Sequence, residues 1–217
     1  AGRIVWDTRS YAFLKGDAPT SVNPSLWRQE KLNNEHGLFE VADGIYQVRG
    51  YDLANMSLIE GESGWIIVDP LGSRETAMAA MALVNKHLGE RPIRAILFTH
   101  SHIDHFGGVE GIVNAAAARE QGIEIVAPEG LMEEATSENI LAGTAMGRRA
   151  SFLFGMGLER SATGHVGSGL GKAPSAGDWT IMTPTIDIDQ TGQRVVLDGI
   201  EFVFQHTPES EAPSEFV

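Results

Sequence analysis

The chain has 217 residues, with 16 Lys or Arg against 29 Asp or Glu, a formal net charge of −13 and no cysteine. Such an acidic chain is a poor partner for nucleic acid, because phosphate binding relies on clustered Lys and Arg. The lack of cysteine excludes disulfides, thiolate metal sites and a cysteine nucleophile. With 42% hydrophobic residues the chain can fill a core, yet no run approaches the roughly 18 apolar residues of a transmembrane helix.

In chain order, residues 1–40 are mixed and polar and predict an arm that wraps over a domain. Three apolar, β-branched runs then predict strands, and a Gly-Glu-Ser-Gly turn joins the last two. These runs are 44–49, 54–60 and 64–69. Ser73 and Gly89 are typical of the start and end of a helix, and apolar residues recur at helical spacing between them.

In the middle of the chain, predicted strands alternate with predicted helices. The next expected elements are a strand at 93–99, a helix at about 109–121 and a strand at 123–127. Residues 130–163 are amphipathic and predict helices, whereas 164–177 contain five glycines and predict a loop. Asp198-Gly199 predicts a hairpin turn between strands at 195–197 and 200–204. This order of elements predicts a mixed sheet flanked by helices.

One segment carries the chemistry: Thr-His-Ser-His-Ile-Asp-His-Phe-Gly-Gly at residues 99–108. It follows an apolar strand, so we expect it at the carboxyl end of that strand. His100 and His102 are two positions apart in an extended segment and therefore point the same way, which lets them hold one metal ion. Asp104 and His105 turn away and can serve a second metal close by.

Imidazole and carboxylate ligands together suit Zn²⁺, with Fe or Mn as alternatives. So many ligand-type side chains in six consecutive positions are not explained by packing. After them, Gly107 and Gly108 are expected to let the backbone bend into the following helix. Three other histidines lie in loops or in the last turn of a helix and are not expected to be ligands. They are His36, His87 and His165.

The motif resembles the His-X-His-X-Asp-His signature of the metallo-β-lactamase superfamily, and other segments resemble the alkyl sulfatases of that superfamily. These segments include Asn23-Pro24-Ser25-Leu26-Trp27-Arg28-Gln29, Ile45-Tyr46-Gln47-Val48-Arg49-Gly50, Ser137-Glu138-Asn139 and Gly167-Ser168-Gly169-Leu170-Gly171-Lys172. The resemblance implies an α+β fold, the αβ/βα sandwich of the superfamily, truncated here within its second half. It divides the chain into an arm at 1–40 and an incomplete catalytic domain at 41–217, with a helical and Gly-rich insertion at about 130–180.

The resemblance also implies two zinc ions per subunit. His100 and His102 match ligands of the first metal, and Asp104 and His105 match ligands of the second. Glu211, in a Thr-Pro-Glu-Ser-Glu-Ala-Pro segment, matches the carboxylate that completes the first site.

Two further residues bear on the metal site. His206 is a rival to Glu211, because His206-Thr207-Pro208 also resembles the His-Thr-Pro segment of hydroxyacylglutathione hydrolase-type relatives, where that His is the ligand. We prefer Glu211, since the longer alkyl sulfatase match fixes the register. Asp69 matches an Asp that supports the metal loop by hydrogen bonding, with a turn-forming Asp as the alternative.

The implied activity is hydrolysis of alkyl sulfate esters, such as dodecyl sulfate or secondary alkyl sulfates, by a metal-activated water. Side chains that could contact the sulfate are Arg148, Arg149 and Lys172, although a solvated surface charge is the simpler interpretation of each. A channel for the alkyl chain could use side chains of the insertion, with ordinary core packing as the alternative. They are Met132, Phe152, Phe154 and Met156.

Other functions remain open. A thioesterase or lactonase of the same superfamily is the first alternative, and a flavin-partnered di-iron oxidoreductase or a non-catalytic metal-bound scaffold is the second. The family's remaining ligands, general acid and dimerisation domain have no counterpart before Val217. We therefore expect an N-terminal fragment of a homodimeric enzyme, with an incomplete metal site. We expect a periplasmic or secreted location, with the cytoplasm as the alternative.

Overall fold

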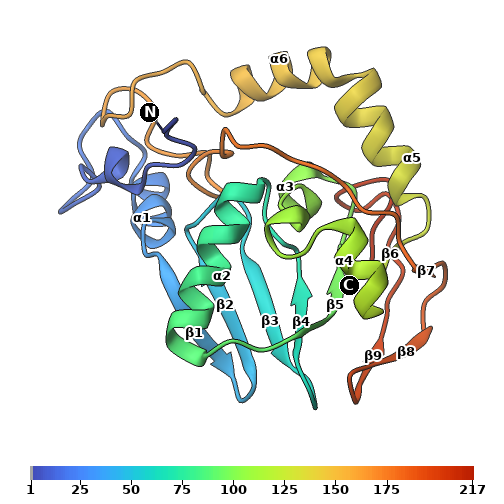
Figure 1. Cartoon of the computed structure of the whole chain (residues 1–217). Coiled ribbons are helices and arrows are strands. Elements are labelled where there is room, and N and C mark those ends of the chain that lie inside the picture. Colours follow the sequence, from blue (N-terminus) through green and yellow to red (C-terminus); the bar gives the residue numbers. More distant parts are fainter. Residues whose placement is uncertain (1) are drawn as a thin grey trace.

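The computed structural model describes residues 2–217, which fold around one seven-stranded mixed sheet with strands in chain order (Figure 1). The first four strands pair antiparallel. They are β1 (Gly37–Ala42), β2 (Ile45–Arg49), β3 (Met56–Glu60) and β4 (Trp65–Val68). Three more continue parallel to β4. They are β5 (Ile93–Leu97), β6 (Glu124–Pro128) and β7 (Ile186–Ile188). The predicted mixed sheet and α+β class are confirmed.

A separate hairpin of β8 (Arg194–Leu197) and β9 (Ile200–Val203) lies beside this sheet. Its turn residues Asp198 and Gly199 have φ values of 42° and 83°, the positive values that a two-residue hairpin turn requires. The Asp198 side chain accepts hydrogen bonds from the backbone N–H groups of Ser63 and Gly64, each at 2.8 Å. The predicted hairpin is confirmed, and its turn is tied to the turn between β3 and β4.

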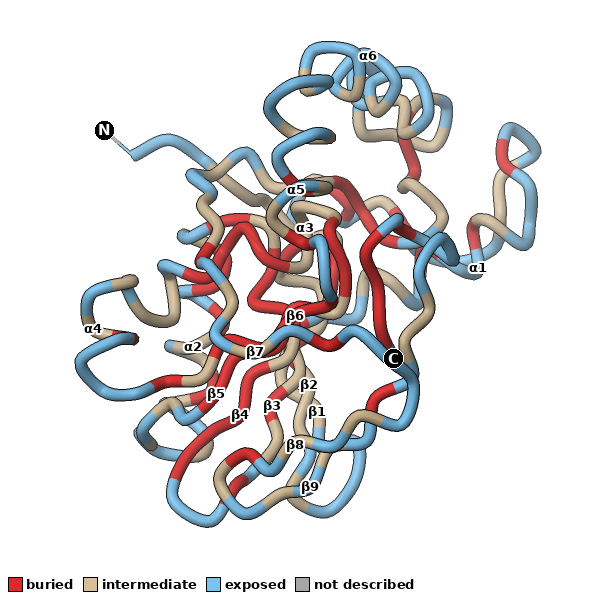
Figure 2. Tube along the Cα trace, turned by 90° about the vertical axis from the view of Figure 1, so that its right-hand side faces the viewer, coloured by how far each residue is buried: buried red, intermediate tan, exposed pale blue. Residues whose placement is uncertain are grey.

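Alternate residues of the central strands supply two cores. Trp65 and Ile67 of β4 pack in the larger core with Val84 of α2 (Arg74–Leu88). Ile66, between them, packs with Leu197 on the side of the β8–β9 hairpin. Because both faces of the sheet are covered, β4 is entirely apolar and β5 is apolar except for the exposed Arg94. Figure 2 shows both strands largely in the colour of buried residues.

The long helix begins and ends as predicted. Ser73 precedes α2 and its hydroxyl accepts a hydrogen bond from the Thr76 N–H, while Gly89 follows it with φ of 82°. This positive φ is readily adopted by glycine and terminates the helix. Ala77 and Val84 are fully buried, so the predicted apolar stripe faces the sheet.

The amino-terminal region is more ordered than predicted. A short 3₁₀ turn, η1 (Thr8–Tyr11), is followed by α1 (Pro24–Asn33) and then by β1. The arm boundary expected at residue 40 falls within β1, so the sheet begins earlier than predicted. The Asn23 side chain caps α1 by accepting a hydrogen bond from the Ser25 N–H, and asparagine is a common residue at the start of a helix.

The remaining helices are shorter than predicted. The helix expected at 109–121 is divided into a 3₁₀ turn, η2 (Val109–Gly111), and α4 (Ala115–Gln121), because Asn114 caps α4. The helical part of the insertion consists of three short pieces and ends in turns near Gly155. They are α5 (Leu131–Thr136), a π-helical turn η3 (Ser137–Leu141) and α6 (Gly143–Leu153). No helix within residues 2–217 has both the length and the hydropathy to cross a bilayer.

Candidate metal centre

Three predicted ligands converge just beyond the carboxyl end of β5. His100 Nε2 lies 3.1 Å from His102 Nδ1. Glu211 Oε1 lies 3.9 Å from His100 Nε2 and 3.8 Å from His102 Nδ1. The ligand atoms of these three side chains all lie within 4.8 Å of one another. Two imidazole nitrogens and a carboxylate oxygen facing one point suit a divalent metal such as zinc.

The rival histidine is placed differently. His206 is not part of this group of ligand atoms. Its backbone forms an isolated antiparallel bridge with Phe216, and its N–H donates to Thr191 Oγ1 at 3.1 Å. The geometry therefore supports Glu211 rather than His206 as the third donor.

Asp104 and His105 form a second set of donors next to the first. Both follow directly from the motif, in the short helix α3 (Ile103–Phe106). His105 Nε2 lies 3.4 Å from Asp104 Oδ2, and the His105 ring centroid is 4.0 Å from that of His100. Burial lowers the pKa of His105, but its hydrogen bonds to Asp104 and Asp69 outweigh this and raise the pKa to about 10. The negative charge that holds this proton would equally attract a metal cation.

Asp69 supports both sets of donors. Its Oδ2 atom accepts a hydrogen bond from His105 Nδ1 at 2.8 Å and another from Thr99 Oγ1 at 2.8 Å, while its Oδ1 accepts from the Thr99 N–H at 2.9 Å. Asp69 and Leu71 have φ values of 56° and 67°, which are uncommon for residues with a Cβ. These hydrogen bonds hold the loop after β4 in that conformation, beside the metal motif.

The same contacts fix the tautomer of His100. Thr99 Oγ1 lies 2.9 Å from His100 Nδ1 and gives its one proton to Asp69, so His100 Nδ1–H donates to Thr99. The lone pair of His100 Nε2 then faces Glu211 and His102. Burial, together with the nearby His105, lowers the pKa of His100. A neutral imidazole with Nε2 free is the form that binds a metal.

Two glycines bring the motif close to the loop after β4. A Cβ atom on Gly107 would lie 2.4 Å from the Gly72 carbonyl oxygen, and one on Gly108 would lie 2.2 Å from the Pro70 oxygen. Both glycines have negative φ, −58° and −84°, which other residues adopt readily. The prediction that they serve a backbone bend is therefore wrong: glycine is needed here for the close approach of two backbones.

Two acidic residues near the cluster were missed. Glu215 Oε2 accepts hydrogen bonds from the N–H groups of Glu211 at 2.7 Å and Ala212 at 3.0 Å, so it holds the turn that carries Glu211. Glu138 Oε1 lies 3.9 Å from His102 Nε2. The spacing of Glu215 four residues after Glu211 was a usable signal, whereas Glu138 comes from the insertion and only the tertiary fold brings it near.

The side chains considered for substrate contact fall into two groups. Arg148 and Arg149 are exposed on α6, whereas Lys172 is only 1% exposed. A solvated surface charge is therefore the wrong interpretation of Lys172. Phe152 is 93% exposed, so it belongs neither to the core nor to an enclosed channel in this structure. Of the other channel candidates, Met132 and Phe154 are half-buried and Met156 is exposed.

Comparison with known proteins gives the family. Residues 49–203, well over half of the chain, match the sequence model of the metallo-beta-lactamase superfamily. The chain belongs to this superfamily. The predicted superfamily and its fold are therefore confirmed.

Three proteins named as alkyl or alkyl/aryl sulfatases are similar to the whole chain. A linear primary-alkylsulfatase of Pseudomonas sp. is 50% identical over 218 residues, and an alkyl/aryl-sulfatase of Saccharomyces cerevisiae is 49% identical over 217 residues. Each alignment covers 100% of this chain, but 32% and 34% of those proteins. The structure of the stereoselective inverting sec-alkylsulfatase Pisa1 from Pseudomonas sp. matches with a TM-score of 0.93 at 48% identity, over 98% of this chain and 34% of that one. The chain thus spans about a third of the length of these relatives.

Proposed function

We propose that the protein carrying this chain hydrolyses alkyl sulfate esters to an alcohol and inorganic sulfate at a centre of two zinc ions. The main support is the convergence of His100, His102 and Glu211 in a chain that is 50% identical along its whole length to a linear primary-alkylsulfatase. The predicted homodimer and periplasmic or secreted location stay predictions.

Each donor has a role in this proposal. His100, His102 and Glu211 would hold the first zinc ion, and Asp104 and His105 would contribute to the second. Bound zinc would lower the pKa of a coordinated water and polarise the ester. Asp69 accepts the Nδ1 proton of His105, so a metal ion on the Asp104 side would have to displace only the Nε2 proton of that ring.

This arrangement accounts for an anionic substrate on a chain with a net charge of −13. Asp69, Asp104 and Glu211 lie among the donors and their support, and Glu138 and Glu215 lie close by. Two Zn²⁺ ions would neutralise most of this negative charge and offer the sulfate oxygens metal cations to bind directly. This direct binding, rather than a positive surface, would hold the sulfate group despite the acidic surface around it.

Sulfate release from dodecyl sulfate and from a secondary alkyl sulfate tests the proposal on the zinc-loaded protein. We expect a chelator to abolish release and zinc to restore it. His102→Ala should lower the rate more than about 100-fold, because it removes a direct ligand. His87→Ala is the matched control, since His87 is exposed in the last turn of α2, and should leave the rate unchanged. Hydrolysis of thioesters or lactones without sulfate release would overturn the proposal.

A further inference from the structure

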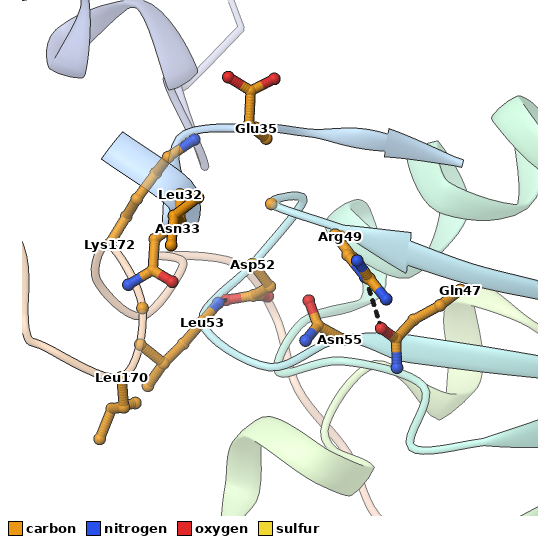
Figure 3. Close-up of a pocket in the computed structure, with 12 residues that line it drawn as sticks. Leu32, Asn33, Glu35, Gln47, Arg49, Asp52, Leu53, Asn55, Leu170 and Lys172 are labelled. Carbon is orange, nitrogen blue, oxygen red and sulfur yellow. Dashed lines mark hydrogen bonds between the residues drawn. The ribbon is translucent and has the colours of Figure 1, made fainter. Parts of the chain in front are cut away.

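A polar pocket of about 290 Å³ lies on the same edge of the sheet as the metal centre. Figure 3 shows the side chains that line it. β2 runs parallel to β4 and β5, because β3 is antiparallel to both β2 and β4. The carboxyl end of β2 therefore shares an edge with the ends of β4 and β5, where the metal motif lies. The pocket is lined by residues at the end of β2 and the start of β3, by the end of α1 and by the Gly-rich loop around Lys172.

Lys172 is the unusual residue of this pocket. Its side chain is only 1% exposed, and its Nζ atom has no hydrogen-bond partner among the described residues. Burial lowers the pKa of Lys172, and the charges of Glu30 and Glu35 partly offset this. An ammonium group that is buried without a hydrogen-bond partner is unfavourable, so an anion in the pocket would stabilise the charged form of Lys172.

A second cation faces the pocket from the opposite side (Figure 3). Arg49, at the end of β2, donates from Nε to Gln47 Oε1 at 2.6 Å and lies over the Phe39 ring at 5.0 Å. Within residues 2–217 it forms no salt bridge. Asn33 and Asn55 add side-chain amides to the lining. The pocket thus offers two cationic groups and two amides.

The nearby carboxylates accept hydrogen bonds from other groups or are exposed to solvent. Asp52 accepts five hydrogen bonds, three from backbone N–H groups and two from hydroxyls. Glu30 is buried, and burial raises its pKa; it accepts from the N–H of Gly169 and the amide of Asn33. Glu35 is exposed at the rim. Neither Glu30 nor Glu35 forms a salt bridge with Lys172 in the described structure.

We propose that this pocket binds a small oxyanion at a site separate from the metal centre, with Lys172 and Arg49 as the cationic contacts. Arg and Lys are the side chains that pair best with carboxylate and sulfate-type groups, and the amide of Asn55 can donate a further hydrogen bond. Inorganic sulfate and small carboxylates share this chemistry. The site does not depend on the proposed activity, because binding can be measured without turnover.

Calorimetric titration of the full chain with sodium sulfate tests this site. The protein is treated with a chelator first, so that bound metal does not contribute to the signal. Sodium chloride keeps the ionic strength constant. We expect saturable binding of one sulfate per chain. A parallel titration with sodium acetate compares the affinity for a carboxylate with the affinity for sulfate. Lys172→Met should weaken the binding at least about tenfold, as expected for loss of a charged hydrogen bond.

Two further variants make the result specific. Lys86→Met removes the same charge from an exposed position on α2 and should leave the affinity unchanged. Arg49→Gln should weaken sulfate binding as Lys172→Met does. If Lys172→Met fails to fold, Arg49→Gln alone tests whether the cationic side chains of the pocket bind the anion. The proposal is overturned if neither anion binds saturably to the unmodified chain, or if the Lys172 and Arg49 variants bind as tightly as that chain does.

Discussion

Asp69 Oδ2 lies 2.8 Å from His105 Nδ1, and the same carboxylate accepts hydrogen bonds from the hydroxyl and the N–H of Thr99. One side chain therefore orients a predicted ligand of the second metal and the residue that precedes a predicted ligand of the first. The loop after β4 thus supports both halves of the candidate metal centre.

Asp69→Asn is expected to weaken zinc binding. The substitution keeps the shape of the side chain but replaces one accepting oxygen with an amide that donates, so the contacts to Thr99 and His105 cannot all be kept. Loss of such a supporting contact lowers metal affinity about 10- to 100-fold. Competition with a chromophoric chelator measures this. Asp189→Asn makes the same charge change at an exposed site, and equal affinities for the two variants would contradict the role of Asp69.

Gly107→Ala is expected to destabilise the fold. Its Cβ would meet the Gly72 carbonyl at 2.4 Å, and such overpacking lowers the free energy of unfolding by about 1–3 kcal/mol. Gly147→Ala is the control: Gly147 lies inside α6 with no atom within 4 Å of the added carbon, so the change should raise that free energy by about 0.5–1 kcal/mol. Urea unfolding measures both, and equal effects would refute the close approach.

Asp198 makes stability depend on pH. Hydrogen bonds from Ser63 and Gly64 hold the pKa of Asp198 below its ordinary value of 3.8. A carboxyl whose pKa is lowered on folding stabilises the fold above its unfolded pKa, and this stability is lost as the pH falls through the folded pKa. The difference in free energy of unfolding between the unmodified chain and Asp198→Asn should therefore be constant above about pH 4.5 and shrink below pH 3.8. A difference that grows towards acid pH would be inconsistent with this.

The central strands and α2 were predictable because their patterns are local. β4 and β5 are covered on both faces and read as largely apolar runs, and α2 has a cap, a stripe and a terminating glycine. α1 was missed because only Trp27 and Glu30 of its residues are buried, which leaves little periodicity. β7 has three residues, too few for any pattern.

The residues of the candidate site also fall into those that the sequence predicted and those that only the fold reveals. The motif at 99–108 was identifiable because its donors are adjacent in sequence, and Glu211 was placed by the register of a longer resemblance. Glu215 contacts Glu211 locally, four residues along the chain, whereas Glu138 reaches the cluster only through the tertiary fold. Lys172 was assigned to solvent because lysine usually is, and only the packing of α1 and the loop after β2 around the Gly-rich loop reveals that it is buried.

The central claim is that His100, His102 and Glu211 bind one metal ion. Anomalous diffraction at the zinc edge, from crystals of the zinc-soaked protein, tests it most directly. We expect a peak at about 2.0–2.2 Å from His100 Nε2, His102 Nδ1 and a Glu211 oxygen. A peak bonded to His206 with Glu211 turned to solvent, or no peak at the cluster in zinc-saturated crystals, would contradict the claim.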